Sequence, residues 1–316
     1  MTGMRPFRFL ADVQQVVAGP ELAARAQRAE GMGYHALVIP DHLLGQLSPI
    51  VAMTTVAAAT STLRVSAFVM NNDLRHPAVL AQDLASLDVL SGGRVDIAIG
   101  AGWNKPEYDA IGLPFDRTPV RQARLAESIT VLKGLFTGTP FSFAGEHYTV
   151  TDYTAGPVPV QRPHPPFFIG GGGRRTLTLA GQEADIVGLA PRIKPDATVD
   201  AASLTLAATR EKIEWVREAA GNRFDSLEFN IYPSVWPATV TDDLRGEARR
   251  VIDHLRSRTG VELTDDEVID SPHLFIGSVD RLVEKFVQLR EELGISSILL
   301  GGIGELEPVL ERLSGS

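Results

Sequence analysis

The chain has 316 residues, 44% of them hydrophobic and 22% charged, with a formal net charge of −9 at pH 7. This is ordinary globular composition, and the negative charge argues against a nucleic-acid-binding surface, which usually carries a basic stripe. The absence of cysteine excludes disulfides, thiolate metal ligands and cysteine nucleophiles.

No apolar stretch approaches the roughly 20 residues that a membrane helix needs. Residues 1–13 lack the basic region, apolar run and cleavage site of a secretory signal. We therefore expect a cytoplasmic protein that contacts neither a membrane nor nucleic acid.

Strand-like and helix-like segments alternate along the chain. The predicted strands, mostly short apolar runs, are residues 7–12, 36–40, 63–70, 95–100, 166–170, 185–189, 227–235 and 296–300. The predicted helices are residues 20–30, 50–59, 77–90, 119–136, 174–183, 203–220, 242–258, 280–293 and 306–313. A β-hairpin is expected around Ala144 and Gly145. This order predicts the α/β class, with residues 1–316 forming a single (β/α)8 TIM barrel with insertions; a doubly wound open sheet is the alternative.

The loops that follow the strands of a barrel carry its chemistry. Asp41 and His42 follow the second predicted strand. A histidine titrates near neutrality, so His42 is a candidate for proton transfer. In the structural alternative, Asp41 caps a turn and His42 is an ordinary loop residue.

Two further loops carry polar groups and glycines. After the third strand, Asn71 opens a polar turn that could present amides to a ring edge; the alternative is turn chemistry with an N-cap before Pro77. After the fourth strand, Gly100 and Gly102 would let backbone approach a ligand, and Trp103 offers a flat wall. The dinucleotide fingerprint fails here, because Lys105 occupies the third glycine position and no helix is expected to begin there. A purely structural tight turn is the alternative.

Four glycines, residues 170–173, follow the fifth strand and lead into a predicted helix that begins with Arg174, Arg175 and Thr176. Free amides, a positive helix end and guanidinium groups favour phosphate binding. The segment does not match a Walker loop.

No histidine spacing indicates a metal site, and no nucleophile elbow is present, so no metal is expected. An apolar barrel with an aromatic wall, a phosphate cradle and one histidine suits a phosphorylated redox cofactor.

Residues 74–94 (LRHPAVLAQDLASLDVLSGGR), followed by VDIAIGAGW, resemble the luciferase-like monooxygenase superfamily, and within it the oxidoreductases that use the deazaflavin coenzyme F420. The resemblance implies that His42 is the acid/base near the reactive carbon and that Asp41 lies toward the ring. It also implies a non-proline cis peptide near Phe68-Val69. The expected catalytic residues are His42 and Trp103, and the expected cofactor contacts are Asp41, Phe68, Val69, Asn71, Gly102, Gly171, Gly172, Gly173, Arg174, Arg175 and Thr176.

The expected function is hydride transfer between coenzyme F420 and an unidentified small organic substrate. Two alternatives remain: an FMN-dependent two-component monooxygenase on the same fold, and a non-catalytic flavin-binding protein. Trp103 stands where the sugar-phosphate dehydrogenase branch has a carboxylate, which points to a less polar substrate than glucose 6-phosphate. The resemblance also implies a homodimer, formed by the helices after the second and third strands. The direction of hydride transfer and the arginine that contacts the phosphate do not follow from the sequence.

Overall fold

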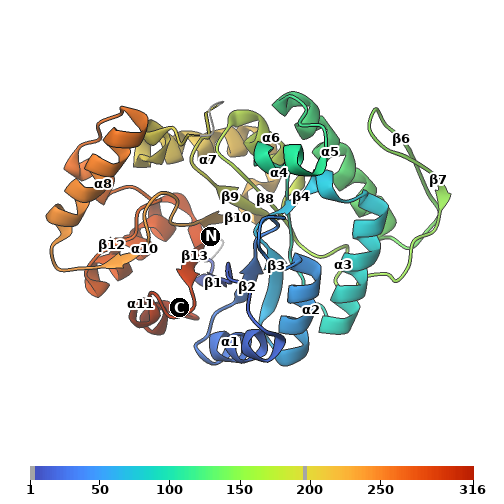
Figure 1. Cartoon of the computed structure of the whole chain (residues 1–316), viewed down its shortest axis with the longest axis horizontal. Helices are drawn as coiled ribbons and strands as arrows, with labels where there is room; N and C mark the ends of the chain where they lie inside the picture. Colours follow the sequence, from blue (N-terminus) through green and yellow to red (C-terminus); the bar gives the residue numbers. More distant parts are fainter. Residues whose placement is uncertain (1–3, 195–197) are drawn as a thin grey trace. The chain divides into compact units, whose positions relative to one another are not determined.

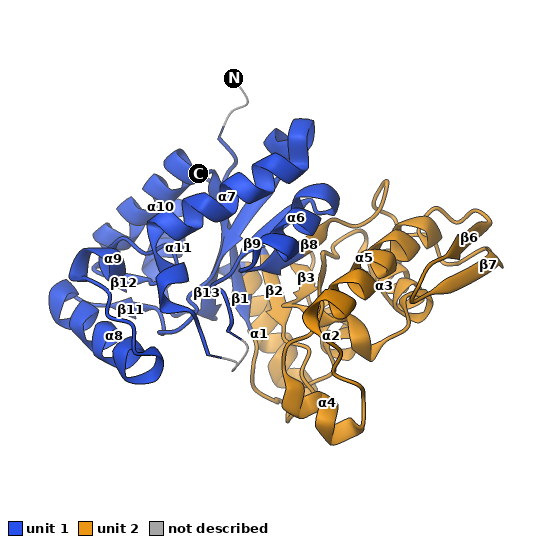
Figure 2. Cartoon of the chain, turned by 90° about the horizontal axis from the view of Figure 1, so that it is seen from above, with its two compact units in different colours: residues 1–12, 31–35, 169–316 blue, residues 13–30, 36–168 orange. Residues whose placement is uncertain are grey.

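The computed structural model describes residues 4–194 and 198–316. The chain divides into two compact units (Figure 2). Unit 1 comprises Met1–Asp12, Gly31–His35 and Ile169–Ser316, and unit 2 comprises Val13–Glu30 and Ala36–Phe168. The expected single domain over residues 1–316 stays a prediction.

Unit 1 contains a parallel sheet. Its strands, in spatial order, are β1 (Arg8–Asp12), β13 (Ile295–Gly302), β10 (Glu228–Ile231), β9 (Ile186–Leu189) and β8 (Phe167–Gly171), which begins in unit 2. In register, Ser297 lies opposite both Arg8 and Asn230. All residues of β9 and β10 are buried, as expected for a parallel sheet covered on both faces.

The other elements of unit 1 follow these strands in the chain (Figure 1). They are α6 (Arg174–Glu183), η2 (Ala201–Leu204), α7 (Leu206–Ala220), η3 (Gly221–Ser226), β11 (Thr239–Val240), α8 (Leu244–Thr259), α9 (Asp265–Ile269), β12 (Ile276–Gly277), α10 (Val279–Leu293) and α11 (Glu307–Leu313). The short elements α9, β11 and β12 were not expected, because a few residues carry no readable periodicity.

Unit 2 contains two parallel strand pairs, β2 (Ala36–Ile39) with β3 (Arg64–Ala67) and β4 (Met70–Asn71) with β5 (Ile97–Gly100). A parallel bridge between Val65 and Val95 joins the two pairs. The helices are α1 (Gly19–Gly31), α2 (Pro49–Ala59), η1 (Asn72–Leu74), α3 (Pro77–Ser91), α4 (Lys105–Ile111) and α5 (Thr118–Leu135). The predicted hairpin is confirmed as the antiparallel pair β6 (Phe141–Ala144) and β7 (Thr149–Tyr153).

Some predicted boundaries were wrong. The third predicted strand is interrupted at a cis peptide between Phe68 and Val69, so β3 and β4 are separate. The seventh predicted strand ends at Ile231, just before the Tyr232-Pro233 pair, because proline has no N–H to donate to a sheet. The predicted helix 203–220 begins only after Thr205, whose side chain caps it. None of the described helices is long and apolar enough to cross a membrane.

Candidate active site

His42 lies three residues beyond the carboxyl end of β2 and is partly buried. Its Nδ1 atom is 2.9 Å from Oε1 of Glu107, whose side chain is only 3% exposed. The Trp103 ring stands edge-on to the imidazole, with the ring centroids 5.6 Å apart, and is 59% exposed. The two residues expected to be catalytic are therefore neighbours, and both are reachable from solvent.

Glu107 was absent from the sequence-based site because α4 was not expected. The expectation that no helix begins at Lys105 was wrong, since α4 starts there. The sequence does contain a signal for this helix. Pro106 stands in its first turn, and Gly112 forms a left-handed cap at its end, with φ 71°. This pattern of proline near the start and glycine after the end is typical of a short helix.

Asp41 is buried and links the end of β2 to Asn71 and Arg75 by hydrogen bonds. Its carboxylate accepts two hydrogen bonds from the Arg75 guanidinium, at 2.6 and 3.0 Å. The backbone N–H of Asn71 also donates to Oδ2 of Asp41, at 2.9 Å. These contacts give Asp41 a structural role, and its orientation toward a cofactor ring stays a prediction.

The Asn71 side chain belongs to the same network. Its Oδ1 accepts from the N–H of Asp73, at 3.1 Å, and from the Tyr108 hydroxyl, at 2.9 Å. Burial and the nearby Asp73 carboxylate raise the pKa of Tyr108 to about 12, so its hydroxyl remains a donor. The N-cap expected before Pro77 is also present. The His76 side chain caps α3 by accepting a hydrogen bond from the N–H of Ala78.

Gly102 has φ +74°, and a Cβ added there would overlap the Tyr108 hydroxyl and lie 2.6 Å from Oδ1 of Asn71. Arg121 donates to the carbonyls of Ala101 and Gly102 and thereby fixes the same turn. Packing thus explains this glycine, as the structural alternative proposed. A cofactor contact at Gly102 stays a prediction.

The cis peptide that the resemblance implied between Phe68 and Val69 is confirmed. Both residues are partly buried. A Cβ added at Gly100 would lie 2.8 Å from Cγ2 of Val69, so this glycine lets the two segments approach closely. The Phe68 ring packs against Phe168, with centroids 5.4 Å apart.

The glycine run of unit 1 begins within β8, which includes Gly170 and Gly171, and leads into α6. A Cβ at Gly171 would lie 2.7 Å from Cγ2 of Thr176, and one at Gly172 would overlap the Pro191 carbonyl. A Cβ at Gly173 would meet no heavy atom within 4 Å. Two glycines are therefore explained by packing within the unit, whereas Gly173 faces open space.

Gly173 is also the N-cap of α6, with φ −106°, and has no side chain of its own to cap the helix. The start of a helix carries partial positive charge and backbone N–H groups that favour an anion. Arg174 is exposed and pairs with Glu218 at 2.8 Å, and Arg175 is exposed. A helix N-terminus beside open space and an exposed guanidinium fit the phosphate of a nucleotide-like cofactor.

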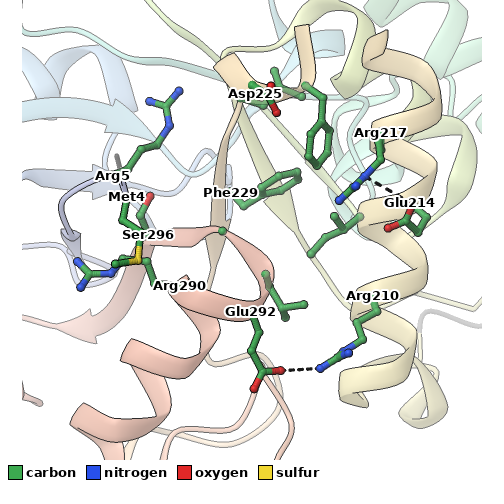
Figure 3. Close-up of a pocket in the computed structure, with 15 residues that line it drawn as sticks. Met4, Arg5, Arg210, Glu214, Arg217, Asp225, Phe229, Arg290, Glu292 and Ser296 are labelled. Carbon is green, nitrogen blue, oxygen red and sulfur yellow. Dashed lines mark hydrogen bonds and ion pairs between the residues drawn. The ribbon is translucent and has the colours of Figure 1, made fainter. Parts of the chain in front are cut away.

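Unit 1 also contains a cavity of about 410 Å³ at the amino ends of β10 and β13 (Figure 3). Phe229 and Ser296 line it, and its rim carries the ion pairs Arg210–Glu292 at 2.6 Å and Arg217–Glu214 at 3.6 Å. Its charges largely satisfy one another. Because chemistry in α/β barrels occurs at the carboxyl ends of strands, this cavity is not the candidate site.

Comparisons with known proteins address the fold and the family. The protein-family model described as luciferase-like monooxygenase matches residues 4–297 of this chain. Over 241 residues, 71% of this chain, the sequence is 32% identical to 66% of an F420-dependent glucose-6-phosphate dehydrogenase from Nakamurella multipartita. Over 128 residues, 40% of this chain, it is 41% identical to 35% of an FMNH2-dependent dimethylsulfone monooxygenase from Pseudomonas putida. The matches thus span between about a third and two thirds of these relatives.

Solved structures of other proteins share the fold of this chain. The coenzyme F420-dependent tetrahydromethanopterin reductase from Methanopyrus kandleri superposes with a TM-score of 0.75 over 98% of each chain, at 20% identity. An F420-dependent secondary alcohol dehydrogenase, in complex with an F420–acetone adduct, superposes with a TM-score of 0.72 over 98% of each chain, also at 20% identity. These likenesses confirm the predicted α/β barrel class, and the family match shows that the chain belongs to the luciferase-like monooxygenase family.

Proposed function

We propose that the chain is a coenzyme F420-dependent oxidoreductase that transfers hydride between this deazaflavin and a small organic substrate, with His42 as the acid/base. The observation that carries the proposal is the placement of His42 beyond a strand end. The buried Glu107 carboxylate is hydrogen-bonded to Nδ1 of His42, and the exposed Trp103 ring lies beside the imidazole. The 32% identity to the F420-dependent glucose-6-phosphate dehydrogenase over 71% of this chain supports the choice of cofactor.

The cofactor, when bound, supplies the hydride chemistry, and the protein supplies binding, orientation and proton transfer. In this proposal the amides of Gly172 and Gly173 and the start of α6 would hold the cofactor phosphate, and Arg175 would add positive charge. The proposed ring contacts are Phe68, Val69, Asn71 and the backbone near Asp41. His42 then holds or moves a proton at a substrate atom.

The substrate in this proposal has an apolar part. Leu43 and Leu44 follow His42 directly and are 49% and 60% exposed, and the exposed Trp103 ring adjoins the imidazole. Exposed apolar side chains around a polar catalytic group favour a ligand with matching apolar surface. A sugar phosphate would gain little from these contacts.

The second candidate function is an FMN-dependent monooxygenase that works with a separate flavin reductase. The 41% identity to the FMNH2-dependent dimethylsulfone monooxygenase favours it. Fluorescence titration of the purified protein with F420 and with FMN separates the two candidates. Our proposal predicts tight F420 binding. Tight FMN binding with no F420 binding would instead favour the FMN-dependent monooxygenase.

The His42→Ala variant tests whether His42 is the acid/base. Loss of general acid/base catalysis is expected to lower kcat by about 100-fold or more on a verified substrate, while cofactor affinity stays near that of the wild type. Unchanged turnover would remove His42 from the mechanism.

We also propose that the chain forms a homodimer through α2 and α3. Large apolar side chains are exposed on both helices, namely Val51 on α2 and Val79, Val89 and Leu90 on α3. Such side chains lose unfavourable contact with water when a second copy covers them.

A further inference from the structure

Glu107 is a buried carboxylate on α4 of unit 2. Its side chain is 3% exposed, and His42 is the one side chain in the described part of the chain that hydrogen-bonds to it. Burying a carboxylate is unfavourable unless a donor or a positive charge compensates for the lost water. The burial of Glu107 therefore depends on the imidazole ring.

The hydrogen bond fixes the proton on the ring. An ionised carboxylate only accepts hydrogen bonds, so Nδ1 of His42 must donate. A neutral imidazole carries one N–H, and this arrangement leaves Nε2 with a lone pair. Among the described residues, none hydrogen-bonds to Nε2, so that nitrogen is free to meet a substrate.

We propose that Glu107 is a positioning residue that holds His42 in the Nδ1–H tautomer and makes Nε2 the nitrogen that exchanges the proton. A proton taken from the substrate forms the Nε2–H bond, and a proton given back leaves from Nε2, while the Nδ1–H bond stays intact. The protonated ring is then an imidazolium ion beside a buried carboxylate, so its charge is compensated. This role rests on the proposed function of His42.

The tautomer can be measured without any cofactor. In protein labelled with 15N-histidine, two-dimensional NMR of the ring nitrogens distinguishes a protonated from an unprotonated nitrogen, and the His42→Ala spectrum assigns the signals. We expect wild-type His42, in its neutral form, to carry its proton on Nδ1. Glu107→Gln should shift the ring toward Nε2–H, because an amide can accept or donate. Glu107→Asp should retain part of the preference.

A wild-type ring protonated on Nε2 would overturn the proposal, and so would a Glu107→Gln ring with an unchanged tautomer. If Glu107→Gln does not fold, the wild-type spectrum alone decides. Asp109→Asn is the matched control on the same helix, since Asp109 is exposed and, among the described residues, forms an ion pair with Lys105 alone. Its His42 spectrum should equal that of the wild type.

Kinetics separate positioning from binding. Glu107→Gln should lower kcat by about 10-fold or more, with KM changed less than kcat and cofactor affinity unchanged, and Glu107→Asp should recover part of the loss. A rise in KM alone would contradict a positioning role. If the wild type binds neither F420 nor FMN, the proposed function fails, and the NMR result still decides what Glu107 does to His42.

Discussion

Asp41 and Arg75 form a two-pronged ion pair, with Nη1 2.6 Å from Oδ2 and Nη2 3.0 Å from Oδ1. The Asp41 side chain is 2% exposed and that of Arg75 is 20% exposed. Because Asp41 immediately precedes His42 and also accepts from the N–H of Asn71, this pair fixes the end of β2 against the turn after β4. The backbone that carries His42 is thus anchored by a largely buried ion pair.

Asp41→Asn should destabilise the fold by about 2–3 kcal/mol, because the substitution leaves a largely buried guanidinium without its charged partner. The shift of the urea unfolding midpoint measures it. The matched control is Asp109→Asn, which breaks an exposed pair with Lys105 and should change stability by less than about 0.5 kcal/mol. Equal effects of the two variants would contradict a structural role for the Asp41–Arg75 pair.

Glu30 makes stability depend on pH in the acid range. Partial burial would raise its pKa, but hydrogen bonds from the backbone N–H groups of Thr62, Leu63 and Ser61 outweigh this and lower the pKa to about 2. The folded state therefore holds the ionised form more strongly than the unfolded state does. The resulting stabilisation is complete above the ordinary pKa of 4.5 and disappears as the pH falls toward 2.

Glu30→Gln should accordingly lower the free energy of unfolding at pH 7 by about 1 kcal/mol, a value reduced by solvent screening of this accessible group. The difference between variant and wild type should shrink as the pH is lowered from 5 to about 2. Urea unfolding at several pH values measures it. A difference that is constant with pH would mean that the charge of Glu30 does not contribute.

The sequence predicted most strands and helices because their apolar runs and glycine or proline ends are local signals. It failed at β3, where the cis peptide at Phe68-Val69 divides an apolar run that reads as continuous. It also placed His42 and Trp103 after strand ends, and the structure brings their rings together, while their catalytic roles stay predictions. It could not supply Glu107, which lies 65 residues from His42 in the chain. Such a partner is set by tertiary packing and leaves no local pattern.

The proposed dimer can be tested on α3. Leu90 is 76% exposed, and Leu90→Glu would place a charge in an interface that excludes water. Light scattering after size-exclusion chromatography should then find the variant as a monomer and the wild type as a dimer. Val240→Glu, on the exposed strand β11 of unit 1, is the control and should remain dimeric. A monomeric wild type would refute the proposed dimer.

Gly172 and Gly173 should respond differently to alanine. A methyl group at Gly172 overlaps the backbone of Pro191 and Arg192, so Gly172→Ala should destabilise the protein by about 1–3 kcal/mol. A methyl group at Gly173 meets open space, and φ −106° is accessible to alanine, so Gly173→Ala should fold with wild-type stability.

The same methyl group would stand where the proposed phosphate approaches the amides of α6, so Gly173→Ala should weaken cofactor binding about 10-fold. Fluorescence titration of the two variants measures affinity, and thermal unfolding without cofactor measures stability. The expected result is a stable Gly173→Ala protein with poor binding, since a methyl group in open space affects only what enters that space. Full affinity in this variant would place the phosphate elsewhere and leave the glycine run with packing as its sole role.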